Sequence, residues 1–163
     1  MRLHTIRARQ SLPISLPEAW SFFSNPRNLS LLTPPSLGLE PVSETPDEMH
    51  PGMIIRYRIR PFPGILLDWV TEITHVVPPR LFVDEQRFGP YRFWHHMHRF
   101  RETPVGVEAE DLVHYALPFG FLGRVVNALA TARQLEGIFE YRQKALERMF
   151  GAVPPVGGGG GDQ

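Results

Sequence analysis

The alternation of apolar and polar residues predicts a first strand over residues 4–12. A helix is predicted to follow from Ser15, whose side chain is suited to cap it, through Phe23. Asn25-Pro26 interrupts this helix, and a second short helix is predicted over residues 27–32. The chain therefore begins with one strand and two short helices in succession.

The rest of the pattern predicts strands and then one long helix. Strand-like stretches cover residues 37–43, 53–60, 66–77, 81–88, 91–102 and 107–117, and turn signals separate them. Such short intervals are typical of an antiparallel meander. From Leu122 to Phe150 the apolar residues recur at helical spacing. This segment predicts one helix of roughly 43 Å at 1.5 Å per residue.

The order of these elements predicts an α+β helix-grip fold. A seven-stranded antiparallel sheet would curl around the long C-terminal helix, and the two short helices would close one end. The space left between sheet and helix would be a cavity. We expect one ligand-binding domain over residues 1–151 and a disordered Pro/Gly tail over residues 152–163, because a run of five glycines cannot recover its ordering entropy.

Composition and charge exclude several classes of protein. The 17 Lys and Arg residues equal the 17 Asp and Glu residues, which argues against a basic nucleic-acid surface. The absence of cysteine excludes disulfides and thiolate metal sites. The N-terminus has no signal-peptide pattern, and no apolar run approaches the ~20 residues of a membrane span. We expect a cytoplasmic location and no integral membrane association.

Three stretches carry a resemblance to a known superfamily. They are residues 16–29 (LPEAWSFFSNPRNL); residues 76–86 (VVPPRLFVDEQ) with Gly89-Pro90-Tyr91, Trp94, His96, His98 and Phe100; and Asp111, Val113, Tyr115 and Pro118 with Ile138-Phe139-Glu140-Tyr141-Arg142. Over roughly residues 3 to 150 the chain resembles the SRPBCC superfamily, which includes START domains, the birch-pollen-allergen fold and the polyketide cyclase/dehydrase group. The second stretch is similar to one bacterial subgroup of it.

The resemblance implies a hydrophobic ligand cavity. Superfamily members bind lipids, sterols, polyketides or plant hormones, and a minority catalyse aromatic ring closure or dehydration. No universal catalytic residue exists to carry over, and no cofactor is implied. Some similar chains are fused to a nucleotide-sugar-epimerase-like domain, which leaves open a protein partner. One fold hosts many activities, so the resemblance indicates the fold more firmly than the function.

Strand alternation predicts which side chains face the cavity. The inward sets are Trp94, His96, His98 and Phe100; Phe82, Asp84, Gln86 and Phe88; and Asp111, Val113, Tyr115 and Leu117. The candidate ligand-binding residues are Tyr57, Trp69, Asp84, Gln86, Trp94, His96, His98, Phe100, Tyr115 and Leu129. Several of these inward groups are polar, and a buried polar group without a hydrogen-bond partner costs free energy. They therefore either hydrogen-bond to one another or face a polar group of a ligand.

Three functions remain open. The favoured one is a module that binds a small hydrophobic molecule such as a lipid, polyketide or aromatic compound. The second is a cyclase- or dehydratase-like enzyme, with acid–base chemistry from His96, His98, Asp111 and Tyr115. The third is a non-catalytic partner domain. His96-x-His98 also has the spacing of a strand-borne metal site that Asp84 or Asp111 could complete, but we expect no metal because the superfamily is not generally metal-dependent.

Overall fold

The computed structural model describes residues 2–42, 46, 48–62, 64–118 and 124–153, without the side chains of residues 62 and 124–129. Its elements are β1 (His4–Leu12), α1 (Leu16–Phe23), the 3-10 helices η1 (Pro26–Leu32) and η2 (Pro35–Leu37), β2 (Glu40–Pro41), β3 (Met53–Phe62), β4 (Ile65–Val77), β5 (Leu81–Phe88), β6 (Phe93–Thr103), β7 (Gly106–Ala116) and α2 (Arg124–Phe150). The predicted disordered tail lies, from residue 154 on, outside the described residues.

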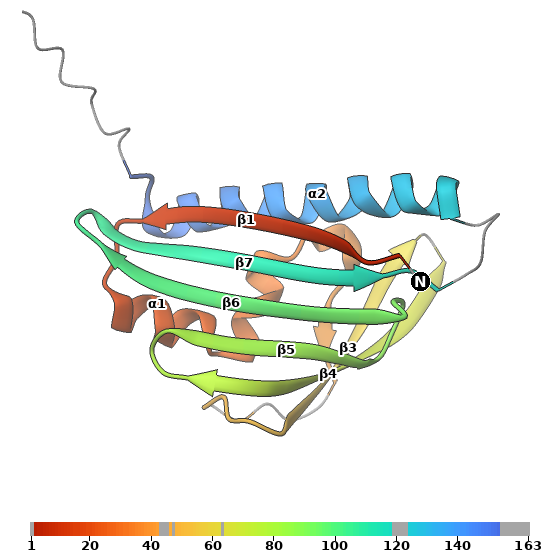
Figure 1. The fold of residues 1–163 in the computed structure, drawn as a ribbon, viewed down its shortest axis with the longest axis horizontal. Helices are drawn as coiled ribbons and strands as arrows, with labels where there is room; N and C mark the ends of the chain where they lie inside the picture. The colour runs from red at the N-terminus through yellow and green to blue at the C-terminus, as the bar shows by residue number, and fades with distance from the viewer. Residues whose placement is uncertain (1, 43–45, 47, 63, 119–123, 154–163) are drawn as a thin grey trace, which may run out of the picture.

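The strands form one seven-stranded antiparallel sheet in the order β1-β7-β6-β5-β4-β3-β2. The N-terminal strand therefore pairs with the last strand, and the meander runs outward from there. The sheet curves, and the long helix α2 lies alongside β1 (Figure 1). The helices α1 and η1 pack at one end, α1 against β6 and β7 and η1 against α2. This confirms the predicted helix-grip arrangement.

Local sequence signals explain the helix-rich end. The Ser15 hydroxyl accepts a hydrogen bond of 3.3 Å from the Glu18 amide and caps α1. The Asn25 carboxamide accepts one of 3.0 Å from the Arg27 amide and caps η1. At the same end, Gly106 in the turn between β6 and β7 has φ +132°, and a Cβ there would collide with the carbonyl oxygen of Leu12. The two helix caps and the close approach of Gly106 to Leu12 hold β1, the short helices and β7 together at one corner.

Two sequence expectations need correction. The strand predicted over residues 37–43 shrinks to Glu40–Pro41, because η2 occupies the start of that range and ends at Gly38 in the left-handed region. Phe88 was predicted to face inward but is 66% exposed. The register between β4 and β5 shifts next to it, from Thr71↔Gln86 to Val70↔Phe88, which breaks the simple alternation.

The interior is divided into apolar clusters around the cavity. One joins α1, β5 and β6, where Phe23, Phe82 and Phe100 meet. Another lies on β3 and β4 and includes Ile55 and Ile73. Within the part of the chain that the structure describes, no helix is both long and apolar enough to cross a bilayer.

Candidate functional site

A cavity of about 370 Å³ lies between the concave face of the sheet, α2 and η1. Most of its wall is apolar, with Ile55 from β3, Trp69 from β4, Leu29 from η1 and Ile138 from α2 among the lining side chains. The long helix closes the cavity because its inward stripe packs over the same face of the sheet. A mostly apolar cavity of this size is suited to a small organic molecule.

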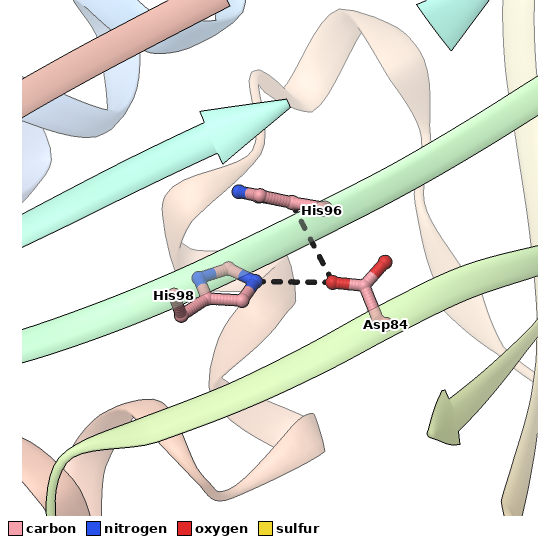
Figure 2. Close-up of side chains that lie close together, drawn as sticks. All are labelled: Asp84, His96 and His98. Atoms are coloured by element: carbon pink, nitrogen blue, oxygen red, sulfur yellow. Dashed lines mark hydrogen bonds and ion pairs between the residues drawn. The ribbon is translucent and has the colours of Figure 1, made fainter. Parts of the chain in front are cut away.

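One region of the wall is polar. Asp84 on β5, His96 and His98 on β6, Asp111 on β7 and Arg142 on α2 form a buried cluster, called here the polar cluster. Register explains how the sheet brings its members together, since Asp84 pairs with His96 and His98 pairs with Asp111 across adjacent strands. Figure 2 shows both imidazoles beside the Asp84 carboxylate.

Each imidazole bridges the two carboxylates. His98 Nε2 lies 3.0 Å from Asp84 Oδ1 in a hydrogen bond, and its Nδ1 lies 2.8 Å from Asp111 Oδ1, an ion-pair contact without hydrogen-bond angles. His96 Nε2 donates to Asp111 Oδ1 at 3.0 Å, and its Nδ1 lies 3.5 Å from Asp84 Oδ1. Every ring nitrogen of the pair therefore faces a carboxylate.

Arg142 anchors the outer side of the cluster. Its NH2 group donates to Asp111 Oδ1 at 3.2 Å, and its Nε lies 3.1 Å from Asp111 Oδ2. Asp111 is not among the residues that line the main cavity, whereas Asp84, His96, His98 and Arg142 are. Asp111 thus supports the histidines from behind, while Asp84, the two imidazoles and Arg142 belong to the cavity wall.

Burial and mutual charge set the protonation of the cluster. Burial raises the pKa of Asp111, but Arg142 and the two histidines outweigh it and hold that pKa well below its usual range. Burial likewise raises the pKa of Asp84, but the same histidines bring it below its ordinary value. Both carboxylates are therefore ionised at neutral pH.

The two histidines shift in opposite directions. Burial and the neighbouring His98 lower the pKa of His96. Burial also lowers that of His98, but its contacts with Asp111 and Asp84 outweigh the burial and raise its pKa. The opposite shifts favour placing the shared positive charge on His98 and leaving His96 neutral, and a charged His98 together with Arg142 balances the two carboxylates. Closely spaced groups with opposite shifts are typical of sites that move or bind protons.

Asp84 offers the polar group that a cavity ligand can reach most easily. Its side chain is 17% exposed, against 6% for His98. Its second oxygen accepts a long hydrogen bond of 3.5 Å from the Thr71 hydroxyl. Burial and the nearby Asp84 charge raise the pKa of Tyr57, so its phenol stays neutral as a donor. A ligand hydroxyl or amine has an acceptor here.

The structure brings together most of the residues proposed from sequence as ligand-binding. Tyr57, Trp69, Asp84, Trp94, His96 and His98 all line the cavity. Three others do not line it: Gln86 bonds the backbone of Tyr91 in the β5–β6 turn, Phe100 packs in the corner cluster, and Tyr115 stacks on His4. The side chain of Leu129 lies outside the described residues.

The proposed catalytic set separates in the same way. His96, His98 and Asp111 form one network, whereas Tyr115 packs against His4 and Tyr91. Arg142 was missed as a site residue. The sequence signal for it was a cation at helical spacing from Leu135, Ile138 and Phe139. In the structure the Arg142 side chain is buried, with 8% of the residue exposed.

Comparisons with known proteins extend the description of the fold. No family model and no curated protein matches the sequence. Solved structures do match: the protein Ms6760 from Mycobacterium smegmatis is 18% identical with a TM-score of 0.61, over 90% of this chain and 92% of that one. Ara h 8.0201 is 14% identical with a TM-score of 0.57, over 90% of this chain and 99% of that one.

A third similar structure is a norcoclaurine synthase point mutant from Thalictrum, in complex with a transition-state analogue. It is 16% identical with a TM-score of 0.61, over 91% of this chain and 96% of that chain. Identities this low carry the fold and not the activity. The sheet order, the enclosing helix and these neighbours together show that this chain has the helix-grip fold.

Proposed function

We propose that this domain binds a small, mostly apolar molecule in the cavity between the sheet and α2, with one polar group of the molecule held by Asp84. The observation that carries the proposal is an apolar cavity of about 370 Å³ whose wall contains one concentrated polar patch. Apolar pockets with a few convergent polar groups are the usual form of small-molecule sites. The helix-grip neighbours, one of which holds a transition-state analogue, support this use of the fold.

The polar patch favours a ligand with a hydrogen-bond donor. Asp84 presents an oxygen that accepts a long hydrogen bond from Thr71, while the rings of Trp69 and Trp94 provide flat apolar surfaces in the same wall. A phenol or a hydroxylated aromatic ring meets both requirements. Hydroxylated lipids and polyketides share this combination of an apolar body and a hydrogen-bond donor.

The test is a fluorescence titration of metal-free protein, prepared with a chelator, against 2-naphthol. We expect saturable binding that changes the emission of Trp69 and Trp94. Asp84→Asn should weaken binding by about 10- to 100-fold, since a hydrogen bond to a charged group contributes about 1.5–3 kcal/mol. Glu72→Gln, on the outer face of β4, is the control and should leave binding unchanged. No saturable binding, or equal loss in both variants, would contradict the proposal.

A second function, acid–base catalysis on the bound molecule, is favoured by one observation. His96 and His98 lie side by side in the cavity wall with opposite pKa shifts, so one can accept a proton while its neighbour donates one. Exchange of deuterium from solvent into a bound phenol or ketone, followed by NMR, tests this function. Exchange must depend on His96; a rate unchanged in His96→Gln would exclude it.

A further inference from the structure

Three side chains of the polar cluster lie close enough together to hold one metal ion. One ligand atom each from Asp84, His96 and His98 lies within 4.8 Å of the others. At the metal–ligand distances of zinc, 2.0–2.2 Å, ligand atoms stand about 2.8–3.6 Å apart for angles between octahedral and tetrahedral. The separations from Asp84 Oδ1 are 3.0 Å to His98 Nε2 and 3.5 Å to His96 Nδ1. Both values fall in that range.

The far side of each ring carries the support that metal-bound histidines need. Ligating imidazoles almost always hold a carboxylate or carbonyl on the nitrogen that does not touch the metal. In this chain the second nitrogens, His96 Nε2 and His98 Nδ1, face Asp111 Oδ1 at 3.0 and 2.8 Å. Arg142 in turn fixes Asp111. One carboxylate therefore orients both rings toward Asp84.

We propose that Asp84, His96 and His98 (Figure 2) bind a divalent transition-metal ion of the zinc or ferrous class, with coordination positions open to the cavity. Two imidazoles favour first-row transition metals over Mg²⁺ and Ca²⁺, which prefer oxygen ligands. The ion takes the place of the His98 Nε2 proton that bonds Asp84, and this proton is released to solvent, so both imidazoles bind as neutral ligands. Two carboxylates and Arg142 carry a charge of −1 together, so a divalent ion gives the site +1 and an attraction for anionic ligand oxygens.

The other residues around the site agree with this assignment. Phe82 stacks on His98 with centroids 4.1 Å apart, and Phe139 contacts the edge of His96. These aromatic neighbours keep the rings in one orientation and bring no further metal ligand. The three ligands leave the remaining coordination positions for water or for the molecule in the cavity, the arrangement of catalytic and not of structural metal sites.

The experiment is a titration of chelator-treated protein with Zn²⁺ alone, by calorimetry, repeated with Co²⁺ by visible absorption. We expect one equivalent to bind, with Co²⁺ absorption bands typical of four or five ligands. His96→Gln and Asp84→Asn should each weaken Zn²⁺ binding at least about 100-fold. Asp111→Asn, which removes only the support, should weaken it by about 10- to 100-fold.

The matched control is His95→Gln. His95 is the next residue on β6, but it lies on the outer face opposite His114, with ring centroids 6.2 Å apart. That pair could collect metal adventitiously, so loss of binding in His95→Gln and retention in His96→Gln would overturn the proposal. Absence of binding in the parent protein would overturn it too. Circular dichroism and the Zn²⁺-induced rise of the unfolding midpoint distinguish a folded variant that lacks the site from an unfolded one.

The proposal of a metal site and the proposal of ligand binding can be disproved independently of each other. The naphthol titration uses metal-free protein, and the Zn²⁺ titration uses no organic ligand. A protein that binds naphthol and no Zn²⁺ would retain the cavity function alone.

Discussion

His96 and His98 lie on one face of β6 with ring centroids 3.8 Å apart, and both rings reach from Asp84 to Asp111. Two imidazolium ions at this distance would repel each other strongly in a buried site. Only one ring therefore takes the charge, and the closer contacts to both carboxylates select His98.

The first prediction concerns this charge in metal-free protein. Long-range ¹H–¹⁵N spectra of the imidazoles should show His98 still protonated above pH 6.5 and His96 neutral below it, because their pKa values shift in opposite directions from about 6.5. Asp111→Asn should lower the pKa of His98. A single titration common to both rings near pH 6.5 would contradict the prediction.

The raised pKa of His98 also predicts the direction in which the free energy of unfolding changes with pH. The folded protein holds the His98 proton more tightly than the unfolded chain, so its contribution is complete below about pH 6.5 and is lost as pH rises through the folded pKa. Urea unfolding from pH 6 to 9 should show this decline. In His98→Gln the decline should flatten, whereas an unchanged slope would assign it to another group.

The second prediction concerns Arg142. Arg142→Met leaves Asp111 buried without its guanidinium, so the free energy of unfolding should fall by about 3–5 kcal/mol. Arg133→Met removes an exposed cation from the same helix and should change it by less than about 0.5 kcal/mol. Equal effects of the two substitutions would mean that the buried pair has no special role.

The third prediction concerns the corner at Gly106. Gly106→Ala should destabilise the protein by more than Gly52→Ala, although φ is positive at both positions. At Gly52 a Cβ meets nothing within 4 Å, so only the backbone cost of about 1–2 kcal/mol applies. At Gly106 the Cβ also collides with the Leu12 carbonyl, which β1 cannot move without losing its pairing with β7. Thermal unfolding of both variants checks the order.

The fourth prediction concerns the cavity. Ile55 and Ile54 are neighbours on β3 that point to opposite faces, 2% and 49% exposed. Ile55→Trp fills part of the cavity and should weaken 2-naphthol binding at least about 10-fold, whereas Ile54→Trp should not. Circular dichroism must show both variants folded. Equal binding by the two would place the naphthol outside the cavity.

Period-2 alternation was sufficient to predict the inward faces of the long strands. Trp94, His96, His98 and Phe100 are all buried, as their alternation on β6 indicates. Alternation fails where the sheet is irregular, and Phe88 turns outward beside the register shift of β4. It also cannot tell an inward residue that faces the cavity from one that is packed by neighbours, as Phe100 and Tyr115 are.

The ion pair between Asp111 and Arg142 could not be predicted from the sequence, for a different reason. Arg142 is 31 residues away, on a helix whose rotation and position along the sheet depend on tertiary packing. Helical spacing puts Arg142 on the same face of the helix as Leu135, Ile138 and Phe139. The spacing does not say which strand this part of the helix covers. The members Asp84, His96, His98 and Asp111 could be proposed from the sequence. Their guanidinium partner Arg142 could not.

The position of Arg142 in the last helix has a consequence for how the chain is made. A ribosome completes β5 and β7, with both buried carboxylates, before it reaches α2. Until α2 packs on the sheet, Asp111 lacks its guanidinium, and a dry inner face would hold an uncompensated charge. Packing of α2 on the sheet therefore brings the guanidinium to Asp111 and covers this face in the same step.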